Sequence, residues 1–283
     1  MTYHSQINLI MLATIIGLAF FLYLTPQFQS ETDDAFQVSL RTPESVQSVR
    51  IVRQGQEIEL RRIGGDWHLM TPVFARADGT LVKKMLNVLS ANSRQRFPLR
   101  DVENFNLDQP LVELYIDDEH FAFGGLAPVT NEQYLAINGD VYLVSPRYAT
   151  WVPVDPLDLA DSKLLADDEL PVRFELNGVS IRQQNGAWQT DAGNGNYQSS
   201  EALERWVNSW RDYRAPELLM KPLQDSEGTA AGIINLQDGR SIIITAVEHE
   251  YGTAFYRDNE QIGYLFPESV SRKLLNPVAT EHD

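Results

Sequence analysis

The sequence predicts an α+β fold in which an N-terminal transmembrane helix is followed by two tandem repeats. The first observation is an internal repeat: Gly65-Asp66-Trp67 recurs as Gly186-Ala187-Trp188, which places the two tryptophans 121 residues apart. The second is that Tyr142-Leu143-Val144 recurs as Tyr264-Leu265-Phe266, at a spacing of 122 residues. Nearly equal spacings at opposite ends of a unit indicate a tandem duplication. The third is an uncharged run near the N-terminus.

The uncharged run extends from Ile7 to Leu24 and is followed by Thr25-Pro26. As a helix it reaches roughly 27 Å, close to the thickness of a hydrocarbon core. A cleaved signal peptide is the alternative, but such a segment normally has a basic start and small residues at a cleavage site, and the run has neither. We therefore expect residues 1–26 to be an uncleaved single-pass anchor that contacts the membrane through residues 7–24.

Charge and composition exclude several classes of partner. The chain has 23 basic and 39 acidic side chains, a formal net charge of −16, and no Lys or Arg precedes Arg41. Nucleic acids and anionic lipid surfaces are bound through clustered Lys and Arg, so neither is expected as a partner of the body. The chain has no cysteine, which removes disulfides and thiolate sites. The hydrophobic share of 43% is sufficient for a sizeable core.

Four regions are expected along the chain. The anchor, residues 1–26, is followed by a polar and acidic tether, residues 27–48. The first repeat covers residues 49–170, including an acidic connector, and the second repeat covers residues 171–283. Each repeat is predicted to contain two strands, one main helix and about four more strands (ββαββββ), with the helix packed against a mostly antiparallel sheet.

A hairpin opens each repeat. Residues 49–53 and 57–62 alternate in polarity around a turn at Gly55, and residues 172–176 and 179–183 flank Asn177-Gly178, a strong two-residue hairpin turn. Trp67 and Trp188 follow at equivalent places. We expect both indoles to anchor the cores, although exposed sugar-binding platforms are an alternative.

One helix follows each hairpin, with Asp78 and Ser200 as the expected N-caps. Apolar residues then recur at helical spacing and predict the buried faces. They are Leu81, Val82, Met85, Leu86 and Leu89 in the first repeat, and Leu203, Trp206, Val207 and Trp210 in the second.

The pattern returns to period two after each helix and predicts successive antiparallel strands. In the first repeat these are residues 111–116, 119–123, 134–137 and 141–145, and in the second they are residues 233–236, 241–247, 253–257 and 261–266. Turns are expected at Asp117-Asp118, Asn138-Gly139 and Asp238-Gly239. Between the repeats, Leu157, Leu164 and Leu165 lie among carboxylates and indicate a short amphipathic connector.

The chain resembles the bacterial family catalogued as domain of unknown function 4340. The resemblance rests on Trp67 to Pro72 and a following helix, on Phe123-Gly124-Gly125, on Tyr134 before Asn138-Gly139, on Val141-Tyr142-Leu143-Val144, and on the run from Leu157 to Leu165. It implies a membrane anchor, an extracytoplasmic body with repeats and, in some members, association with ABC-transporter components. The family has no established catalytic residues, so none is carried over. The second repeat has no counterpart of Gly124-Gly125.

The five histidines are His4, His68, His120, His249 and His282. No two have the spacing of metal ligands, so a zinc site is not expected. Asp117-Asp118-Glu119-His120 and Glu248-His249-Glu250 are expected at matching ends of the two repeats. A carboxylate beside a histidine can hold a divalent ion or move a proton, but we favour the interpretation that both clusters are solvated hairpin turns of an acidic protein. The loop from Asp191 to Asn196 has oxygen ligands and glycines but lacks the spaced acids of a calcium loop.

The remaining binding candidates are Phe123, Gly124 and Gly125. Two adjacent glycines let the backbone of a partner approach closely, although a bulge or tight turn requires glycine for the same reason. The sequence has neither a Gly-x-Ser-x-Gly elbow nor a phosphate-binding glycine loop. We therefore expect no catalytic, cofactor-binding or metal-ligating residues, and no enzymatic activity.

The sequence favours a single-pass protein of a bacterial inner membrane whose periplasmic body serves as an accessory or scaffold protein. Its partner is expected to be another protein, with ABC-transporter components as the class that the resemblance suggests. A glycan- or peptide-binding module that uses the groove between the repeats is the alternative. A hydrolase that uses Asp117, Glu119 or Glu248 with a water molecule is the third interpretation.

Overall fold

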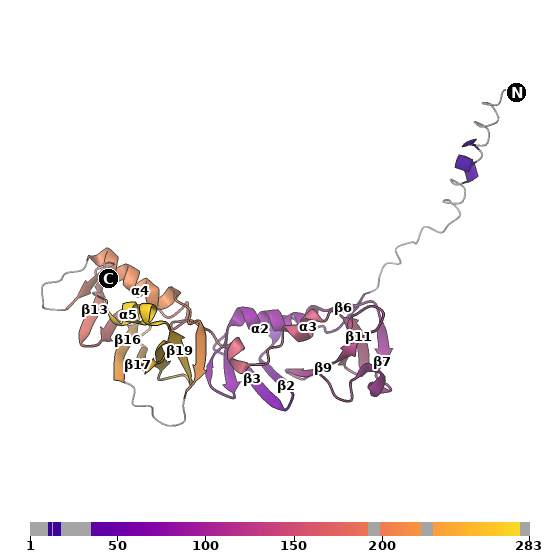
Figure 1. Ribbon diagram of the computed structural model, residues 1–283, viewed down its shortest axis with the longest axis horizontal. Helices are drawn as coiled ribbons and strands as arrows, with labels where there is room; N and C mark the ends of the chain where they lie inside the picture. Colours follow the sequence, from indigo (N-terminus) through magenta and orange to yellow (C-terminus); the bar gives the residue numbers. More distant parts are fainter. Residues whose placement is uncertain (1–10, 13, 18–34, 192–198, 222–228, 278–283) are drawn as a thin grey trace.

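The computed structural model describes residues 11–12, 14–17, 35–191, 199–221 and 229–277. The described residues form two large antiparallel sheets and a small two-stranded one. Figure 1 shows two bodies side by side, with α2 and α3 along one side of the first and α4 and α5 along the same side of the second. We call the body around the nine-stranded sheet the first module, and the body around the eight-stranded sheet the second module.

The first module contains most of the short elements. Its strands are β1 (Phe36–Gln37), β2 (Ser48–Arg53), β3 (Gln56–Ile63), β4 (Asp66–Thr71), β5 (Ala75–Arg76), β6 (Asn92–Ser93), β7 (Arg96–Pro98), β8 (Val112–Ile116), β9 (Glu119–Leu126), β10 (Gln133–Ile137) and β11 (Asp140–Val144). Its α-helices are α2 (Gly79–Leu86) and α3 (Arg147–Thr150), and its 3₁₀ helices are η1 (Pro43–Ser45), η2 (Asn87–Ser90) and η3 (Val102–Phe105).

The second module follows a connector, residues 154–169, that contains the 3₁₀ helix η4 (Pro156–Leu159). Its strands are β12 (Pro171–Leu176), β13 (Val179–Gln184), β14 (Ala187–Thr190), β15 (Glu217–Met220), β16 (Thr229–Leu236), β17 (Ser241–His249), β18 (Gly252–Arg257) and β19 (Ile262–Phe266). Its helices are α4 (Ser200–Asp212) and α5 (Glu268–Leu275).

The two large sheets have the same strand order. The first is β5-β4-β3-β2-β8-β9-β10-β11-β7, and the second is β14-β13-β12-β16-β17-β18-β19-β15. Without β5, the strands correspond one to one, with β4 in the place of β14 and β7 in the place of β15. Trp67 and Trp188 therefore lie on equivalent strands, and both are buried. They are core residues, not exposed platforms.

The predicted fold class is wrong in its composition and in its element order. The structure is mostly β-sheet, with 44% strand and 23% helix. The opening hairpin of each module is followed by a third strand, β4 or β14, that was not predicted, because the segments after Gly65 and Gly186 form strands of their own. The short strands β7 and β15, and the helices α3 and α5, were not predicted. Elements this short contain too few residues for a periodic pattern to reveal them.

The expected transmembrane helix, from Ile7 to Leu24, lies mostly outside the described residues. Among the residues that the structure describes, no helix is long and apolar enough to cross a membrane. His4 and His282 also lie outside the described part, as do residues 192–196 of the loop compared with calcium sites.

The expected tether, residues 27–48, is shorter than predicted. From Phe36 onward the chain is packed against the first module, since β1 pairs with β6. Val38 and Val46 belong to the core of that module. The two valines are isolated in a polar segment, so the sequence did not predict their burial. Their burial depends on strands far along the chain.

The hairpin turns follow the predicted chemistry. Leu176 pairs with Val179 across Asn177-Gly178, and Ile137 pairs with Asp140 across Asn138-Gly139. Both asparagines have positive φ values, the conformation that a two-residue turn of this type requires.

The main helices each differ from the prediction in one detail. Asp78 caps α2 as expected, and its carboxylate accepts from the amides of Thr80 and Leu81. The cap of α4 is Ser199 rather than Ser200. The Ser200 hydroxyl instead accepts from the backbone amide of Trp188, at 3.0 Å, and so joins the helix to strand β14.

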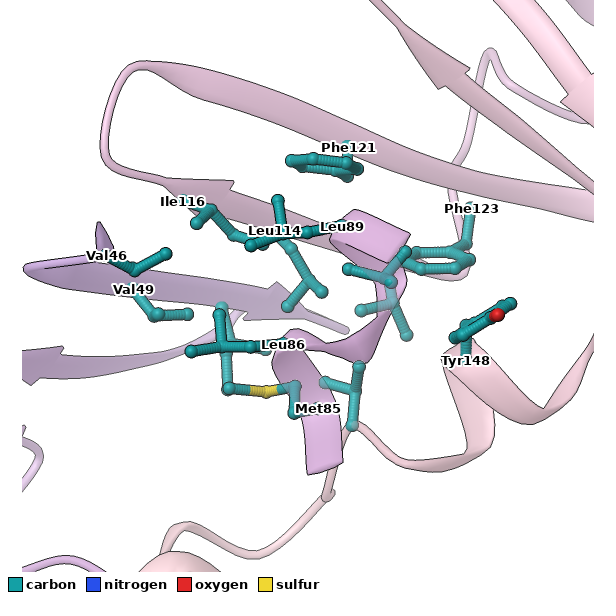
Figure 2. Packing of buried hydrophobic residues seen from close by; sticks show 14 of the residues in the cluster. Val46, Val49, Met85, Leu86, Leu89, Leu114, Ile116, Phe121, Phe123 and Tyr148 are labelled. Atoms are coloured by element: carbon teal, nitrogen blue, oxygen red, sulfur yellow. The ribbon is translucent and has the colours of Figure 1, made fainter. Parts of the chain in front are cut away.

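The core of the first module lies between α2–η2 and the sheet. Figure 2 shows Met85, Leu86 and Leu89 facing side chains of β8 and β9, with Tyr148 from α3 closing one end. Full burial of each such side chain stabilises the folded state by about 1.5–3 kcal/mol. Leu81 is the exception to the predicted face, since 38% of it is exposed.

Candidate functional site

A loop of the same chain packs against Gly124 and Gly125. A Cβ atom on Gly124 would lie 2.3 Å from the backbone oxygen of Phe105, and one on Gly125 would lie 2.7 Å from the side-chain nitrogen of Asn106. The segment that contains η3 therefore packs directly on β9. Phe123 is fully buried in the core. These three binding candidates thus contact other parts of the same chain. The absence of a side chain at the two glycines allows the loop to pack closely on the strand.

His120 belongs to an exposed stack on the first sheet. Its ring lies parallel to that of Tyr115 at 4.3 Å, and the guanidinium of Arg50 covers the other face of Tyr115 at 3.7 Å. The Nε2 atom of His120 is 2.8 Å from Glu113 Oε2, which also accepts from the Tyr115 hydroxyl. The histidine therefore faces a carboxylate other than the adjacent Glu119.

His249 is exposed at the end of β17, beside the turn to β18. The prediction that its cluster and the His120 cluster lie at matching ends is wrong. Because β9 corresponds to β17, the turn between β8 and β9 corresponds to the turn between β16 and β17, at Asp238-Gly239. The two histidines therefore lie near opposite ends of equivalent strands.

The carboxylates of the acidic turn in the first module already have an arginine partner. Arg41 pairs with Asp117, Asp118 and Glu119. Asp117 also accepts from the backbone amide of Ser48, at 2.8 Å. Glu248 lies on the other sheet, so the three carboxylates considered for a hydrolase are not brought together. Among the described residues, no group of His, Asp or Glu has the arrangement of a metal site.

The densest set of interacting charges lies where the two modules meet. The junction segment, residues 72–78, contains β5 at the edge of the first sheet and packs against the second module. Ala75 is fully buried in the core of the second module. The Phe74 amide donates to Gln261 Oε1 and the Gln261 amide donates to the Phe74 carbonyl, both at 2.7 Å. This pair of hydrogen bonds joins the turn between β18 and β19 to the first module.

Arg76 is the centre of the junction. Its Nε atom donates to Glu260 Oε1 at 2.6 Å. Its Nη2 atom donates to the backbone oxygen of Lys163 at 2.6 Å and to the hydroxyl of Tyr264 at 2.9 Å. One side chain of the first module therefore contacts the connector, the second sheet and a turn. A guanidinium suits this role because its donors point in fixed directions.

A second arginine completes the cluster from the opposite side. Arg257, which is 1% exposed, donates to both carboxylate oxygens of Glu169, at 2.7 and 2.6 Å. It also donates to the backbone oxygen of Leu164 at 2.6 Å. The cluster thus contains two guanidinium groups and two carboxylates, so its formal charge is zero. Such bidentate pairs are the strongest hydrogen bonds between side chains.

The electrostatics of the cluster keep both carboxylates ionised. Burial opposes the charge of Glu260, but Arg76 and Arg257 outweigh it and lower its pKa. The pKa of Glu169 is lowered in the same way, since burial is offset by the hydrogen bonds and charge of Arg257. Burial raises the pKa of Tyr264, which stays protonated and donates to Glu260 at 2.5 Å. These groups hold the modules together.

Beside the junction lies an open groove of about 430 Å³. It is bounded by the N-terminal end of α2, by the connector, and by the segment that enters β15. The lining residues are Asp78, Leu81, Asp155, Leu157, Asp158, Ala160, Ser162, Ala215, Pro216, Glu217 and Leu218. It is therefore a surface hollow formed jointly by both modules and the connector.

Comparison with family models identifies a family for this chain. The model described as "Domain of unknown function (DUF4340)" matches residues 67–230, which is more than half of the chain. The chain belongs to this family. No curated protein and no solved structure matches it.

The DUF4340 match does not coincide with one module. It begins in β4 and ends in β16, so that it contains the junction segment, the connector and α4. Arg76 and Glu169 fall inside the match, whereas Arg257 and Glu260 follow it. The matched region is thus the middle of the molecule, where the two modules join.

None of the four charged residues of the junction was identified from the sequence. The one signal was Arg257 at the end of the apolar strand Thr253-Ala254-Phe255-Tyr256, where a charged side chain must find a buried partner. Its partners Glu169 and Glu260 occur in acidic, turn-like segments that resemble solvated loops. Only the tertiary structure shows which carboxylates are buried.

Proposed function

We propose that the protein is a non-catalytic accessory protein that acts as a rigid, two-module scaffold for a protein partner. The observation that carries the proposal is the junction, in which Arg76 and Arg257 hold two buried carboxylates between the modules. Removing one member of such a network leaves a buried charge without its partner, so the arrangement resists opening. A fixed spacing between two surfaces is what a scaffold requires.

The exposed faces of the sheets support partner binding better than their edges do. Both outermost strands of the first sheet, β5 and β7, are short, and β7 ends in Pro98, which has no amide to donate. On the second sheet, the Trp188 amide at the edge is bonded to Ser200. By contrast, Ile233 and Ile243 pair across β16 and β17 with 37% and 45% of their surfaces exposed. Apolar side chains on an open sheet favour contact with another protein.

Attachment to a bacterial inner membrane through residues 7–24, with the two modules in the periplasm, is part of the proposal. So is association with components of an ABC transporter, which rests on the family resemblance. A reporter that is active only outside the cytoplasm, fused after Asp283, tests the location. Activity is expected, and an inactive but expressed fusion contradicts the proposal.

The scaffold function is tested by crosslinking in the native membrane, followed by purification of the full-length protein and identification of the attached chains. We expect a defined partner that is reproducibly enriched. We also expect Arg76→Met, which loosens the junction, to reduce the yield of that partner while Arg61→Met, a substitution at an exposed residue, leaves it unchanged. Recovery of no partner, or equal recovery with Arg76→Met, contradicts the proposal.

A peptide-binding function is the second candidate, and the groove between the modules favours it. A glycan is less well supported, because both tryptophans considered as sugar platforms are buried. The two candidates differ in what they require: a scaffold needs the fixed junction, whereas a peptide site needs the groove lining.

A further inference from the structure

The groove beside the junction has an unbalanced charge. Four carboxylates line it, those of Asp78, Asp155, Asp158 and Glu217. None of the lining residues is Lys or Arg, and no basic side chain of the described residues lies within 4 Å of these four carboxylates. Arg214 pairs with Asp161 and donates to the hydroxyl of Ser162 at the edge of the groove, and has no ion pair with the four carboxylates. Acidic groups elsewhere, such as Asp117 and Glu169, have arginine partners.

The pKa of Asp158 is affected by this charge imbalance. Partial burial raises the pKa of Asp158, and the neighbouring carboxylate of Asp155 raises it further. Asp78 and Asp155 each accept hydrogen bonds from backbone amides through one carboxylate oxygen, at the starts of α2 and η4. A cation in the groove relieves the repulsion between these groups.

The distribution of the carboxylates distinguishes between kinds of cation. The described residues contain no group of three carboxylate or imidazole ligands close enough to hold one metal ion, so the negative charge is spread along the groove. The same groove is also lined by Leu81, Leu157 and Leu218. Lysine and arginine have this same combination, an apolar stem and a charged end. Several such side chains on an extended segment match the groove better than a single ion does.

We propose that the groove between the modules binds a basic segment of a protein partner, with lysine or arginine side chains against Asp155, Asp158 and Glu217. This inference rests on the proposed scaffold function and identifies the chemistry of its partner. The groove has a volume of about 430 Å³ and is open to solvent. The site is composed of both modules, so it exists only while the junction is closed.

The test uses the full-length protein and two short fluorescent peptides, one in which lysine alternates with leucine and one in which glutamate replaces lysine. The groove variant is Asp155→Asn, Asp158→Asn and Glu217→Gln. The matched control is Glu103→Gln, Glu248→Gln and Glu250→Gln, which removes the same charge from exposed positions away from the groove. Thermal unfolding of both variants confirms that they are folded.

We expect saturable binding of the lysine peptide, weaker binding at higher salt, and no binding of the glutamate peptide. The groove variant is expected to raise the Kd about tenfold or more, and the control variant to change it less than about twofold. An equal loss in both variants shows attraction to the net charge only and overturns the inference. So does binding that does not saturate.

The crosslinking experiment separates this inference from the proposed function. If the groove variant still captures the partner at the level of the unmodified protein, the groove is not the binding site, although the scaffold function stands. If no form of the protein captures a partner, both proposals fail. Loss of the partner from the groove variant alone, together with loss of peptide binding, supports both.

Discussion

At the scale of residues, the protein uses its buried charges for structure. Arg257 and Glu169 have almost no exposed surface, and each has bidentate partners, so the cost of removing them from water is offset only while both are present. The exposed pair Arg272 and Glu268 has similar chemistry but is screened by solvent. Position in the fold, rather than residue type, determines what an ion pair contributes.

We predict that Arg257→Met lowers the free energy of unfolding by about 3–5 kcal/mol, because Glu169 is left buried without its partner. The double change Arg257→Met with Glu169→Leu is expected to recover much of that loss, since no unpaired charge remains. Urea unfolding followed by circular dichroism measures both. Arg272→Met is the control and is expected to change stability by less than about 1 kcal/mol. A double variant as unstable as the single one contradicts this account.

The same cluster predicts a loss of stability in acid. The pKa values of Glu169 and Glu260 are lowered in the folded protein, so their contribution is fully present above the ordinary value of about 4.3 and is lost as the pH falls through the folded values. Unfolding midpoints are expected to fall below about pH 4.3. Glu260→Gln is expected to be less stable near neutral pH and to show a shallower fall. Stability that increases on acidification contradicts the assignment.

At the scale of elements, one loop distinguishes the first module from the second. The segment containing η3 lies on β9, and Phe105 and Leu107 pack against Ala122 and Val141 on that face of the sheet. Gly124 permits this approach. The pair of glycines that suggested a binding feature in the sequence is therefore explained by an intramolecular contact.

Gly124→Ala is predicted to destabilise the protein by about 1–3 kcal/mol, since the new Cβ atom meets the backbone oxygen of Phe105 at 2.3 Å. Gly79→Ala is the matched control. Gly79 lies in the first turn of α2, has open space around the new atom, and gains helix propensity, so a change between zero and about 1 kcal/mol of stabilisation is expected. Thermal unfolding of the two variants provides the comparison, and equal effects contradict the packing role of the loop.

At the scale of the whole molecule, the two modules share part of a core. Val73 packs against both hydrophobic cores, and Ala75 belongs to that of the second module although it precedes α2 of the first. Leu159 of the connector packs in the first core, while Leu164 and Leu165 pack in the second. The connector is thus an integral part of both modules rather than a linker, which favours cooperative unfolding.

We predict a single unfolding transition for the intact protein in scanning calorimetry, because each module contributes residues to the other. Arg76→Met is expected to lower the transition temperature and to split the transition in two, since the junction loses its contacts with Glu260 and the connector. Arg61→Met, at an exposed pair with Glu59, is expected to leave one transition. Two transitions in the unmodified protein contradict the shared core.

The sequence by itself determined the local structure: the turns at Asn177-Gly178 and Asn138-Gly139, the cap at Asp78, the buried face of α4 and the burial of both tryptophans. These features depend on residues that are close in sequence, so turn residues and hydrophobic periodicity predict them. Only the tertiary structure decided the third strand of each module, the packing of Val38 and Val46, and the partners of Arg76, Arg257, Glu169 and Glu260. Whether a carboxylate is solvated or buried depends on partners as far as 184 residues away along the chain, and a local sequence pattern does not reveal contacts at that separation.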